Sequence, residues 1–241
     1  MTGTLYLCAT PIGNLEDMTP RVVDTLREVD LIAAEDTRNS LKLLNHFEIR
    51  TPMTSYHEYN KYDKADQLIG NLMEGKNIAL ITDAGTPGIS DPGEVMTVKC
   101  QEAGIPVTSL PGCCACITAL TLSGLSTRRF CFEGFLPQKK GRQKKLSALA
   151  EENRTMIFYE SPFRLVKALE QMAEVFGPTR HACVAREISK MFEEFKRGTL
   201  EELAGWYKQN GVKGEIVLIV AGKDYNLAEE EGLHIEIEEE E

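Results

Sequence analysis

A twelve-residue loop with three glycines, two prolines and two carboxylates carries the clearest chemical pattern in this sequence. It runs from Thr82 to Gly93 (TDAGTPGISDPG), after an apolar run and before a helical pattern. Glycine lets the backbone approach a ligand closely, and carboxylates accept hydrogen bonds from a ribose diol or an amine. A plain strand-to-helix connection needs only about two to six residues. The loop therefore predicts a ligand site rather than an elaborate turn.

The same loop argues against two common reactions. It lacks the lysine of the phosphate-binding pattern GxxxxGK[ST], and it does not fit the dinucleotide pattern GxGxxG. Phosphoryl transfer and hydride transfer therefore have no local support.

Polar segments also follow two other expected strands, at Thr10–Leu15 (TPIGNL) and Glu35–Arg38 (EDTR). Strand ends gather at one edge of a parallel sheet, so we expect all three segments to line one cleft. For Glu35–Arg38 the alternative is a helix cap with a surface ion pair, and spacing alone leaves both open. Tyr159–Arg164 (YESPFR) and Ala185–Lys190 (AREISK) suggest a second functional edge.

The elements that position these segments alternate between β-rich runs and helical patterns, which is typical of α/β layers with a mostly parallel sheet. Thr19 and Pro20 predict a helix start, as N-cap and first helical residue. Strands are expected at Thr4–Ala9, Leu31–Ala34, Met53–Tyr56, Ile78–Thr82, Val107–Leu110, Phe130–Phe132, Thr155–Tyr159, His181–Arg186, Glu193–Arg197 and Glu215–Ala221.

Length and composition predict two folded domains in the cytosol. The chain has 241 residues, of which 42% are hydrophobic and 27% charged, and domains cluster near ~100–150 residues. We expect an N-terminal α/β domain over 1–115, a C-terminal α/β domain over 116–223 and an acidic tail over 224–241. No apolar run approaches the ~20 residues that span a membrane, and the N-terminus lacks a secretion pattern.

The net charge of −10 does not exclude a nucleic-acid partner, because nine acidic residues lie between Asp224 and Glu241. The rest of the chain is close to neutral. Screening makes local patches matter more than the total. One basic patch consists of Lys139, Lys140, Arg142, Lys144 and Lys145; a solvated helix start has the same appearance.

The seven cysteines are scattered through apolar stretches, which indicates reduced core thiols rather than a disulfide framework. Cys113, Cys114 and Cys116 form the one cluster. The spacing does not suit zinc, so we expect no metal and interpret these three as small helix-packing side chains.

Seven segments in order carry a resemblance over about Gly3 to Gly222: TPIGNLEDMTPR, AEDTR, TDAGTPGISDPG, FEGFLP, YESPFR, AREISKMFEEFKRG and KGEIVLIVAG. The set resembles the tetrapyrrole-methylase superfamily, and within it the branch that methylates the 2′-hydroxyl of a cytidine in small-subunit (16S) ribosomal RNA. The resemblance implies two α/β domains with S-adenosyl-L-methionine in the cleft between them, usually in a homodimer. It also implies that naked RNA or an assembled small ribosomal subunit is the partner.

On this resemblance two groups of residues are expected to form the site. The expected cofactor contacts are Pro11, Asp83, Gly85, Thr86, Pro87, Gly88, Ile89, Ser90, Asp91, Ala115, Tyr159 and Gly214. The expected catalytic residues are Glu35, Asp36, Arg38, Glu187 and Lys190. The chain departs from the family pattern where Cys113-Cys114-Ala115 follows Pro-Gly, and where Phe163 replaces a histidine. Phenylalanine cannot titrate, so position 163 is not an obligatory proton carrier.

The expected reaction is methyl transfer, in which alignment supplies much of the rate and a nearby carboxylate or neutral lysine takes a proton. Two alternatives remain open from the sequence. One is a precorrin C-methyltransferase with the same fold and cofactor, and the other is a nucleotide-binding module without turnover.

Overall fold

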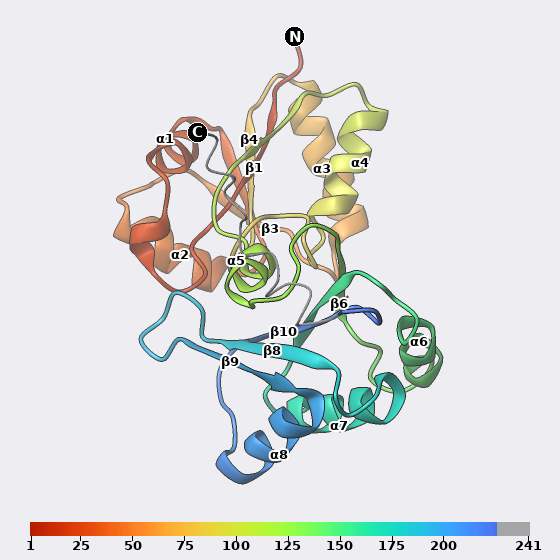
Figure 1. The fold of residues 1–241 in the computed structure, drawn as a ribbon. Helices are drawn as coiled ribbons and strands as arrows, with labels where there is room; N and C mark the ends of the chain where they lie inside the picture. The colour runs from red at the N-terminus through yellow and green to blue at the C-terminus, as the bar shows by residue number, and fades with distance from the viewer. Residues whose placement is uncertain (226–241) are drawn as a thin grey trace, which may run out of the picture. The chain divides into compact units, whose positions relative to one another are not determined.

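The computed structural model describes residues 1–225, so the predicted acidic tail lies almost wholly outside the described residues. The chain divides into two compact units (Figure 1). The first comprises Met1–Thr118 together with Glu187–Glu193, and the second comprises Ala119–Arg186 and the described residues from Glu194 onward. A segment late in the chain therefore belongs to the first unit.

The first unit is a parallel sheet with helices on both faces, in the strand order β3-β2-β4-β1-β5. Its strands are β1 (Leu5–Cys8), β2 (Leu31–Ala34), β3 (Met53–Ser55), β4 (Ile78–Ile81) and β5 (Val107–Leu110). Its helices are η1 (Leu15–Asp17), α1 (Pro20–Glu28), α2 (Thr37–His46), α3 (Lys61–Met73) and α4 (Gly93–Glu102), and α5 (Ala115–Leu122) leads out of it. The sequence expectation of parallel α/β layers is confirmed here.

The alternation of side-chain direction along each strand explains why both faces of this sheet are covered by helices. Ile32 and Ala34 pack with α1 and α2 in one core, whereas Ala33 packs with α3 and α4 in the other. Figure 1 shows α1 and α2 on one side of the sheet and α3 and α4 on the other. Successive side chains of a strand point to opposite faces, and a sheet covered on both faces has strands buried throughout. The predicted helix start is also confirmed, because the Thr19 side chain accepts from the Val22 N–H and Pro20 begins α1.

The second unit is a mixed sheet in the order β6-β7-β10-β8-β9. Its strands are β6 (Phe130–Phe135), β7 (Thr155–Glu160), β8 (His181–Arg186), β9 (Glu194–Thr199) and β10 (Ile216–Val220). Its helices are α6 (Arg142–Leu149), α7 (Leu165–Phe176) and α8 (Leu200–Asn210). Among the described strands of this unit, β6 and β7 alone pair in parallel, so the expectation of a mostly parallel sheet is wrong for this half. A parallel pair needs a long crossover, whereas β8 and β9 are joined by the short segment Glu187–Glu193.

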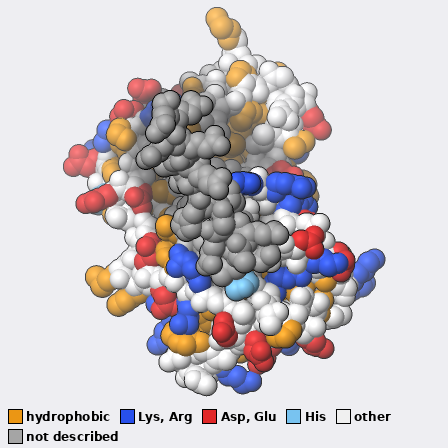
Figure 2. All heavy atoms as spheres, in the orientation of Figure 1, with side chains coloured by type: hydrophobic (Ala, Val, Ile, Leu, Met, Phe, Trp, Pro, Cys, Tyr) orange, Lys and Arg blue, Asp and Glu red, His pale blue; other side chains and the backbone are white. Residues whose placement is uncertain are grey.

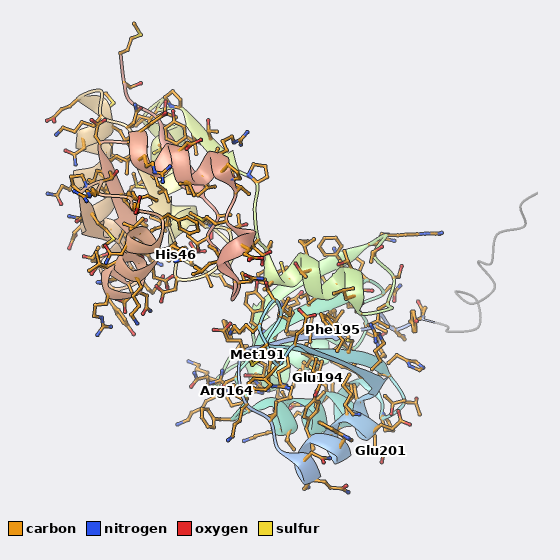
Figure 3. The ribbon with its side chains drawn as sticks, turned by 90° about the vertical axis from the view of Figure 1, so that its left-hand side faces the viewer. His46, Arg164, Met191, Glu194, Phe195 and Glu201 are labelled. Carbon is orange, nitrogen blue, oxygen red and sulfur yellow. The ribbon has the colours of Figure 1, made fainter. Side chains whose placement is uncertain are left out.

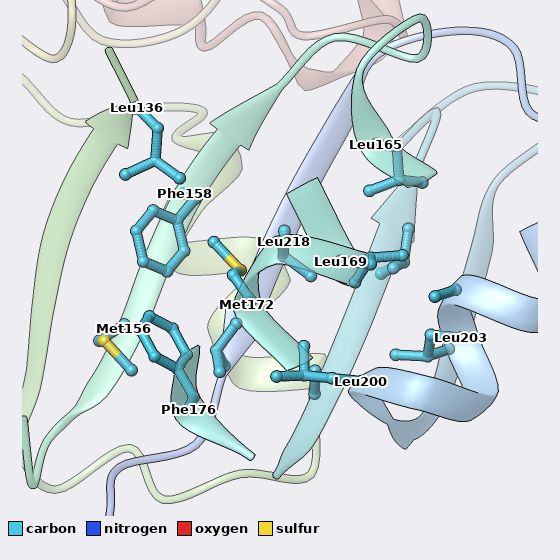
Figure 4. Packing of buried hydrophobic residues seen from close by; sticks show 14 of the residues in the cluster. Leu136, Met156, Phe158, Leu165, Leu169, Met172, Phe176, Leu200, Leu203 and Leu218 are labelled. Carbon is cyan, nitrogen blue, oxygen red and sulfur yellow. The ribbon is translucent and has the colours of Figure 1, made fainter. Parts of the chain in front are cut away.

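Helices α7 and α8 pack on this mixed sheet and close its core. Figure 4 shows Met172 and Phe176 of α7 beside Phe158 of β7, with Leu200 and Leu218 in the same cluster. Within residues 1–225, no helix is long and apolar enough to cross a membrane.

Candidate functional site

Loops from several strands of the first unit meet at the carboxyl edge of its sheet. Thr10, after β1, exchanges two backbone hydrogen bonds of 3.0 Å with Gly85, after β4. The Asp83 N–H donates to Glu35 Oε2, after β2, at 3.3 Å. These contacts bring the three polar segments together at one sheet edge, and the cleft that they were expected to line stays a prediction.

The glycine-rich loop is shaped from within by Asp91. Its carboxylate accepts from the Gly88 N–H at 2.8 and 3.0 Å and from the Gly93 N–H at 2.8 Å. A Cβ at Gly93 would lie 2.6 Å from Gly88 N, so this turn closes only around glycine. Burial raises the pKa of Asp91 more than these hydrogen bonds lower it. Asp91 therefore stabilises the conformation of the loop. This role differs from that of ligand acceptor, which the sequence analysis predicted for both carboxylates of the loop.

A residue with a strained backbone and a hydrogen bond from a buried tyrosine fix the rest of the loop. Gly85 and Gly88 have φ of 87° and 92°, and Ser90, at 67°, adopts the left-handed region without being glycine. Glycine adopts positive φ readily, whereas the left-handed conformation costs a residue such as Ser90 ~1–3 kcal/mol and persists only where surrounding contacts impose it. The buried Tyr56 hydroxyl donates to the Pro92 carbonyl at 3.0 Å.

The side chains of this loop divide into an inner and an outer set. Thr86 and the buried Pro87 face the protein, and Thr86 Oγ1 donates to the Cys113 carbonyl at 2.8 Å. Asp83, Ile89 and Ser90 are exposed. The outer set and the half-buried Gly88 are thus the parts available to a ligand, whereas Gly85, which the sequence analysis expected as a cofactor contact, is buried.

Glu35 and Asp36 are adjacent in sequence, but the pKa values of their carboxyl groups shift in opposite directions. Asp36 caps α2 through the Arg38 N–H at 2.9 Å and pairs with the Arg38 guanidinium at 2.6 Å. The hydrogen bonds from Arg38 lower the pKa of Asp36 to about 2. Burial, with added repulsion from Asp83 and Asp91, raises the pKa of Glu35. The alternative interpretation of this segment, a helix cap with a surface ion pair, is therefore correct for Asp36 and Arg38. Glu35, with its raised pKa, is the more basic of the two carboxylates.

The segment Glu187–Glu193 brings Lys190 to the same unit. Lys190 Nζ pairs with Glu187 Oε1 at 3.0 Å, and the Lys190 side chain lies against Gly13. The Ser189 hydroxyl hydrogen-bonds to the Asp17 carboxylate, and both Glu187 and Ser189 have positive φ, at 52° and 68°. The sequence analysis predicted Glu187 and Lys190 as site residues but did not predict the contact between Ser189 and Asp17. No local pattern in the sequence indicates that contact. Two positive-φ residues without glycine mark a segment held in place by its contacts.

Of the remaining expected cofactor contacts, Pro11 and Ala115 are half-buried in the first unit. Tyr159 and Gly214 belong to the second unit. Tyr159 lies on β7 with its ring 5.1 Å from that of Phe132, and Gly214 precedes β10 with φ of 91°.

The YESPFR segment is organised by Glu160, a buried carboxylate. Glu160 accepts from the Ser161 N–H and from Arg164 Nε, each at 2.8 Å; Arg164, labelled in Figure 3, precedes α7. The Arg142 guanidinium lies 3.9 Å from Glu160 and donates to Gln171 at 2.7 Å.

The basic patch must be corrected at two positions. Arg142 is 8% exposed and belongs to this buried network, and Lys145 pairs with Glu133. Lys139, Lys140 and Lys144 remain exposed. Figure 2 shows Lys and Arg side chains gathered over the region of α6. Spacing in the sequence cannot distinguish an arginine that points inward from its exposed neighbours.

Known proteins resemble the chain over most of its length. Residues 4–204 match the family described as Tetrapyrrole (Corrin/Porphyrin) Methylases. Proteins named Ribosomal RNA small subunit methyltransferase I are similar: that of Synechocystis sp. is 53% identical, covering 91% of this chain and 79% of its own. That of Escherichia coli O157:H7 is 50% identical, covering 96% and 81%.

Solved structures share the fold at low identity. Diphthine synthase has a TM-score of 0.74 at 15% identity, covering 95% of this chain and 94% of its own. Uroporphyrin-III-C-methyltransferase from Thermus thermophilus has a TM-score of 0.65 at 20% identity, covering 92% and 94%. The ordered motifs, the two α/β units and the family match over most of the length all agree. The chain therefore belongs to the tetrapyrrole (corrin/porphyrin) methylase family.

Proposed function

We propose that this chain is an S-adenosyl-L-methionine-dependent methyltransferase that acts on the 2′-hydroxyl of a cytidine in small-subunit ribosomal RNA, in the cytoplasm. The observation that carries the proposal is identity of about half over nine-tenths of the chain to proteins named as ribosomal RNA methyltransferases from several bacteria. The position on the ribose is the finer part of the proposal, and it rests on the sequence resemblance and on the chemistry below.

S-adenosyl-L-methionine is the cofactor. The relatives are methyltransferases, and a neighbour of the same fold was solved complexed with S-adenyl homocysteine. The glycine-rich loop fits such a ligand, because a Cβ built at Gly88 would meet no heavy atom closer than 3.9 Å, which leaves open backbone there. Asp83, Gly88, Ile89 and Ser90 would contact the cofactor, while the buried Gly85, together with Thr86, Pro87 and Asp91, holds the loop in shape. When bound, the cofactor supplies a methyl group already activated by its sulfonium.

The protein's own contribution is then alignment and removal of one proton. A ribose hydroxyl is a poor nucleophile until its proton is taken, and a carboxylate whose pKa lies closer to neutrality is the better acceptor. Glu35 meets this condition and Asp36 does not. The Lys190 ammonium, held by Glu187 beside the 10–17 segment, suits the positioning of a phosphate or carboxylate. We therefore assign Glu35 as proton acceptor and Lys190 as a positioning group.

The tetrapyrrole alternative shares the fold but lacks a specific observation in its favour. The tetrapyrrole-modifying neighbours are at most 20% identical, and diphthine synthase matches with a higher TM-score, so these likenesses do not select an acceptor. The relatives of about 50% identity are named for ribosomal RNA.

The direct test is to incubate the protein with methyl-labelled cofactor and one of three acceptors: small ribosomal subunits, naked small-subunit RNA, or uroporphyrinogen III. The RNA is digested and the labelled nucleoside is identified by mass spectrometry. Label on the sugar fragment of cytidine is expected. Label on a base, or transfer only to the tetrapyrrole, would contradict the proposal.

We further propose a homodimer, which would enlarge the surface offered to RNA. Met191, labelled in Figure 3, and its neighbour Phe192 are apolar side chains of the Glu187–Glu193 segment that are 89% and 66% exposed, and they suit burial between subunits. Light scattering at micromolar concentration should report two chains per particle.

A further inference from the structure

Cys114 and Cys116 form a thiol pair that the proposed chemistry does not use. Their sulfur atoms lie 3.3 Å apart, within hydrogen-bond distance for sulfur. Cys116 is 4% exposed and Cys114 is half-buried. The sequence interpretation of both as packing residues therefore leaves out a direct contact between two nucleophilic groups.

Cys114 also has the setting of a reactive thiol. Its carbonyl accepts from the Thr118 N–H at 3.1 Å, so Cys114 occupies the cap at the start of α5. The hydrogen bond with Cys116, followed by the N–H groups of Ile117 and Cys116, lowers the pKa of Cys114 although burial opposes this. Thiolates at helix starts are the cysteines that react with oxidants.

Other cysteines provide the contrast within the same chain. Burial raises the pKa of Cys100, Cys131 and Cys183 to about 11. Burial also raises the pKa of Cys113, the immediate neighbour. These thiols remain protonated at neutral pH and react slowly.

The pair is linked through one residue to the glycine-rich loop. The carbonyl of Cys113 accepts the Thr86 hydroxyl at 2.8 Å, and a Cβ at Gly85 would lie 3.5 Å from the same oxygen. A disulfide needs its sulfurs about 2.0 Å apart. We expect formation of this bond to strain the start of α5, and Cys113, which is bonded directly to Cys114, would transmit the change to Thr86.

We propose that Cys114 and Cys116 are a redox-sensitive site, in which hydrogen peroxide drives a reversible disulfide that weakens cofactor binding at the Thr82–Gly93 loop. The Cys114 thiolate attacks one peroxide oxygen, giving a sulfenic acid and hydroxide. The Cys116 sulfur then displaces that oxygen, so two thiols and one peroxide become one disulfide and two waters. The effect on affinity rests on the proposed function. A disulfide of this kind in a cytosolic protein is a transient, redox-sensing one.

The first measurement maps the bond. The full-length protein is treated with graded hydrogen peroxide, free thiols are alkylated, and the peptide that contains positions 113–116 is sequenced by mass spectrometry. We expect the Cys114–Cys116 link to form first, with loss of two of the seven alkylatable thiols. In Cys116→Ser, which keeps a hydrogen-bond donor beside Cys114, the reaction should stop at a Cys114 sulfenic acid that dimedone traps.

The second measurement is S-adenosyl-L-methionine affinity by calorimetry before oxidation, after oxidation and after dithiothreitol. Oxidation should weaken affinity roughly tenfold, or about 1.4 kcal/mol, and reduction should restore it. Cys114→Ser keeps a favourable cap residue and should bind equally well with and without peroxide. Cys131→Ser, which removes a half-buried thiol from β6, should behave as the wild type.

Three results would overturn the switch: no Cys114–Cys116 link, a link that leaves affinity unchanged, or peroxide sensitivity that survives in Cys114→Ser. Reduced wild-type protein that fails to bind the cofactor would instead contradict the proposed function, so the two failures are distinguishable.

Discussion

The side chain of Lys190 lies so close to Gly13 that a Cβ at position 13 would be 2.3 Å from Lys190 Cγ. Gly13 follows β1, whereas Lys190 lies between β8 and β9, so the contact joins distant parts of the sequence. The absence of a side chain at position 13 lets the lysine stem pass, and Glu187 then fixes its ammonium.

Gly13→Ala should displace Lys190 while the fold survives, because the clashing atoms belong to a flexible side chain. Methyl transfer should fall by up to roughly 10²-fold, the cost of misplacing a positioning group. Cofactor affinity should stay near wild type, whereas the melting temperature should fall modestly because the positive φ of 156° at position 13 strains a residue that has a Cβ.

A double-mutant cycle checks this assignment. Lys190→Met alone should reproduce the defect, and adding Gly13→Ala to it should cost nothing further. The matched control is Gly205→Ala, where no atom lies within 4 Å of the built Cβ. Additive losses would mean that Gly13 acts independently of Lys190.

Gly88→Ala should weaken S-adenosyl-L-methionine binding about tenfold or more, because the new methyl group points into space that residues 1–225 leave empty. The backbone at φ 92° adds strain of ~1–2 kcal/mol, so the melting temperature should fall modestly. Gly177→Ala matches the strain, with φ 102° and open space at the end of α7. Calorimetry should show lost affinity only in the first variant. Equal affinities would move the cofactor away from this loop.

Much of the fold follows from local patterns in the sequence. The strands Leu31–Ala34, Val107–Leu110 and His181–Arg186 agree residue for residue with the expectation. The direction of pairing in the second sheet does not follow, because periodicity along one strand carries no information about its partner. β10, an apolar strand like those of a parallel sheet, runs antiparallel between β7 and β8.

The candidate site was predictable to the extent that strand ends must gather at one sheet edge. This rule brought Thr10, Glu35 and Asp83 together correctly. It could not separate Glu35 from Asp36, since their protonation depends on burial and on the turn of Arg38 back onto Asp36. It also could not place Ser189 against Asp17, a contact made by folding of the whole chain.

Glu35→Gln should reduce methyl transfer by roughly 10²-fold or more, the usual contribution of general base catalysis. Because the pKa of Glu35 is raised by burial, the wild-type rate should increase with pH through a midpoint above the ordinary glutamate value of ~4.3. That acid limb should disappear in Glu35→Gln. Asp36→Asn should retain it, because Asp36 titrates near 2.

The Glu35→Gln substitution should affect stability and activity in opposite directions. The folded state binds the Glu35 proton more tightly than the unfolded state, so the ionised side chain destabilises the fold above its raised pKa. Glu35→Gln should therefore be at least as stable as wild type at neutral pH, and the difference should shrink as pH falls through that pKa. The exposed Glu28→Gln provides a control for both assays. A less stable Glu35→Gln would contradict the raised pKa of Glu35, and a variant with full activity would remove Glu35 from the mechanism.

The basic patch offers a test that separates RNA contact from structural support. Lys139 and Lys140 are exposed, so replacing both with glutamine should weaken RNA binding and flatten its salt dependence by about 0.7–0.9 per lost phosphate contact. Stability and cofactor affinity should not change. Arg142→Gln should do the reverse: the variant removes a guanidinium beside the buried Glu160 and a bond to Gln171, which should cost roughly 1–3 kcal/mol of unfolding free energy. Its salt slope, measured below its melting temperature, should match wild type. If Arg142→Gln flattened the slope as much as the lysine pair, or if the lysine variant left the slope unchanged, the patch would not be the RNA surface that the sequence predicts.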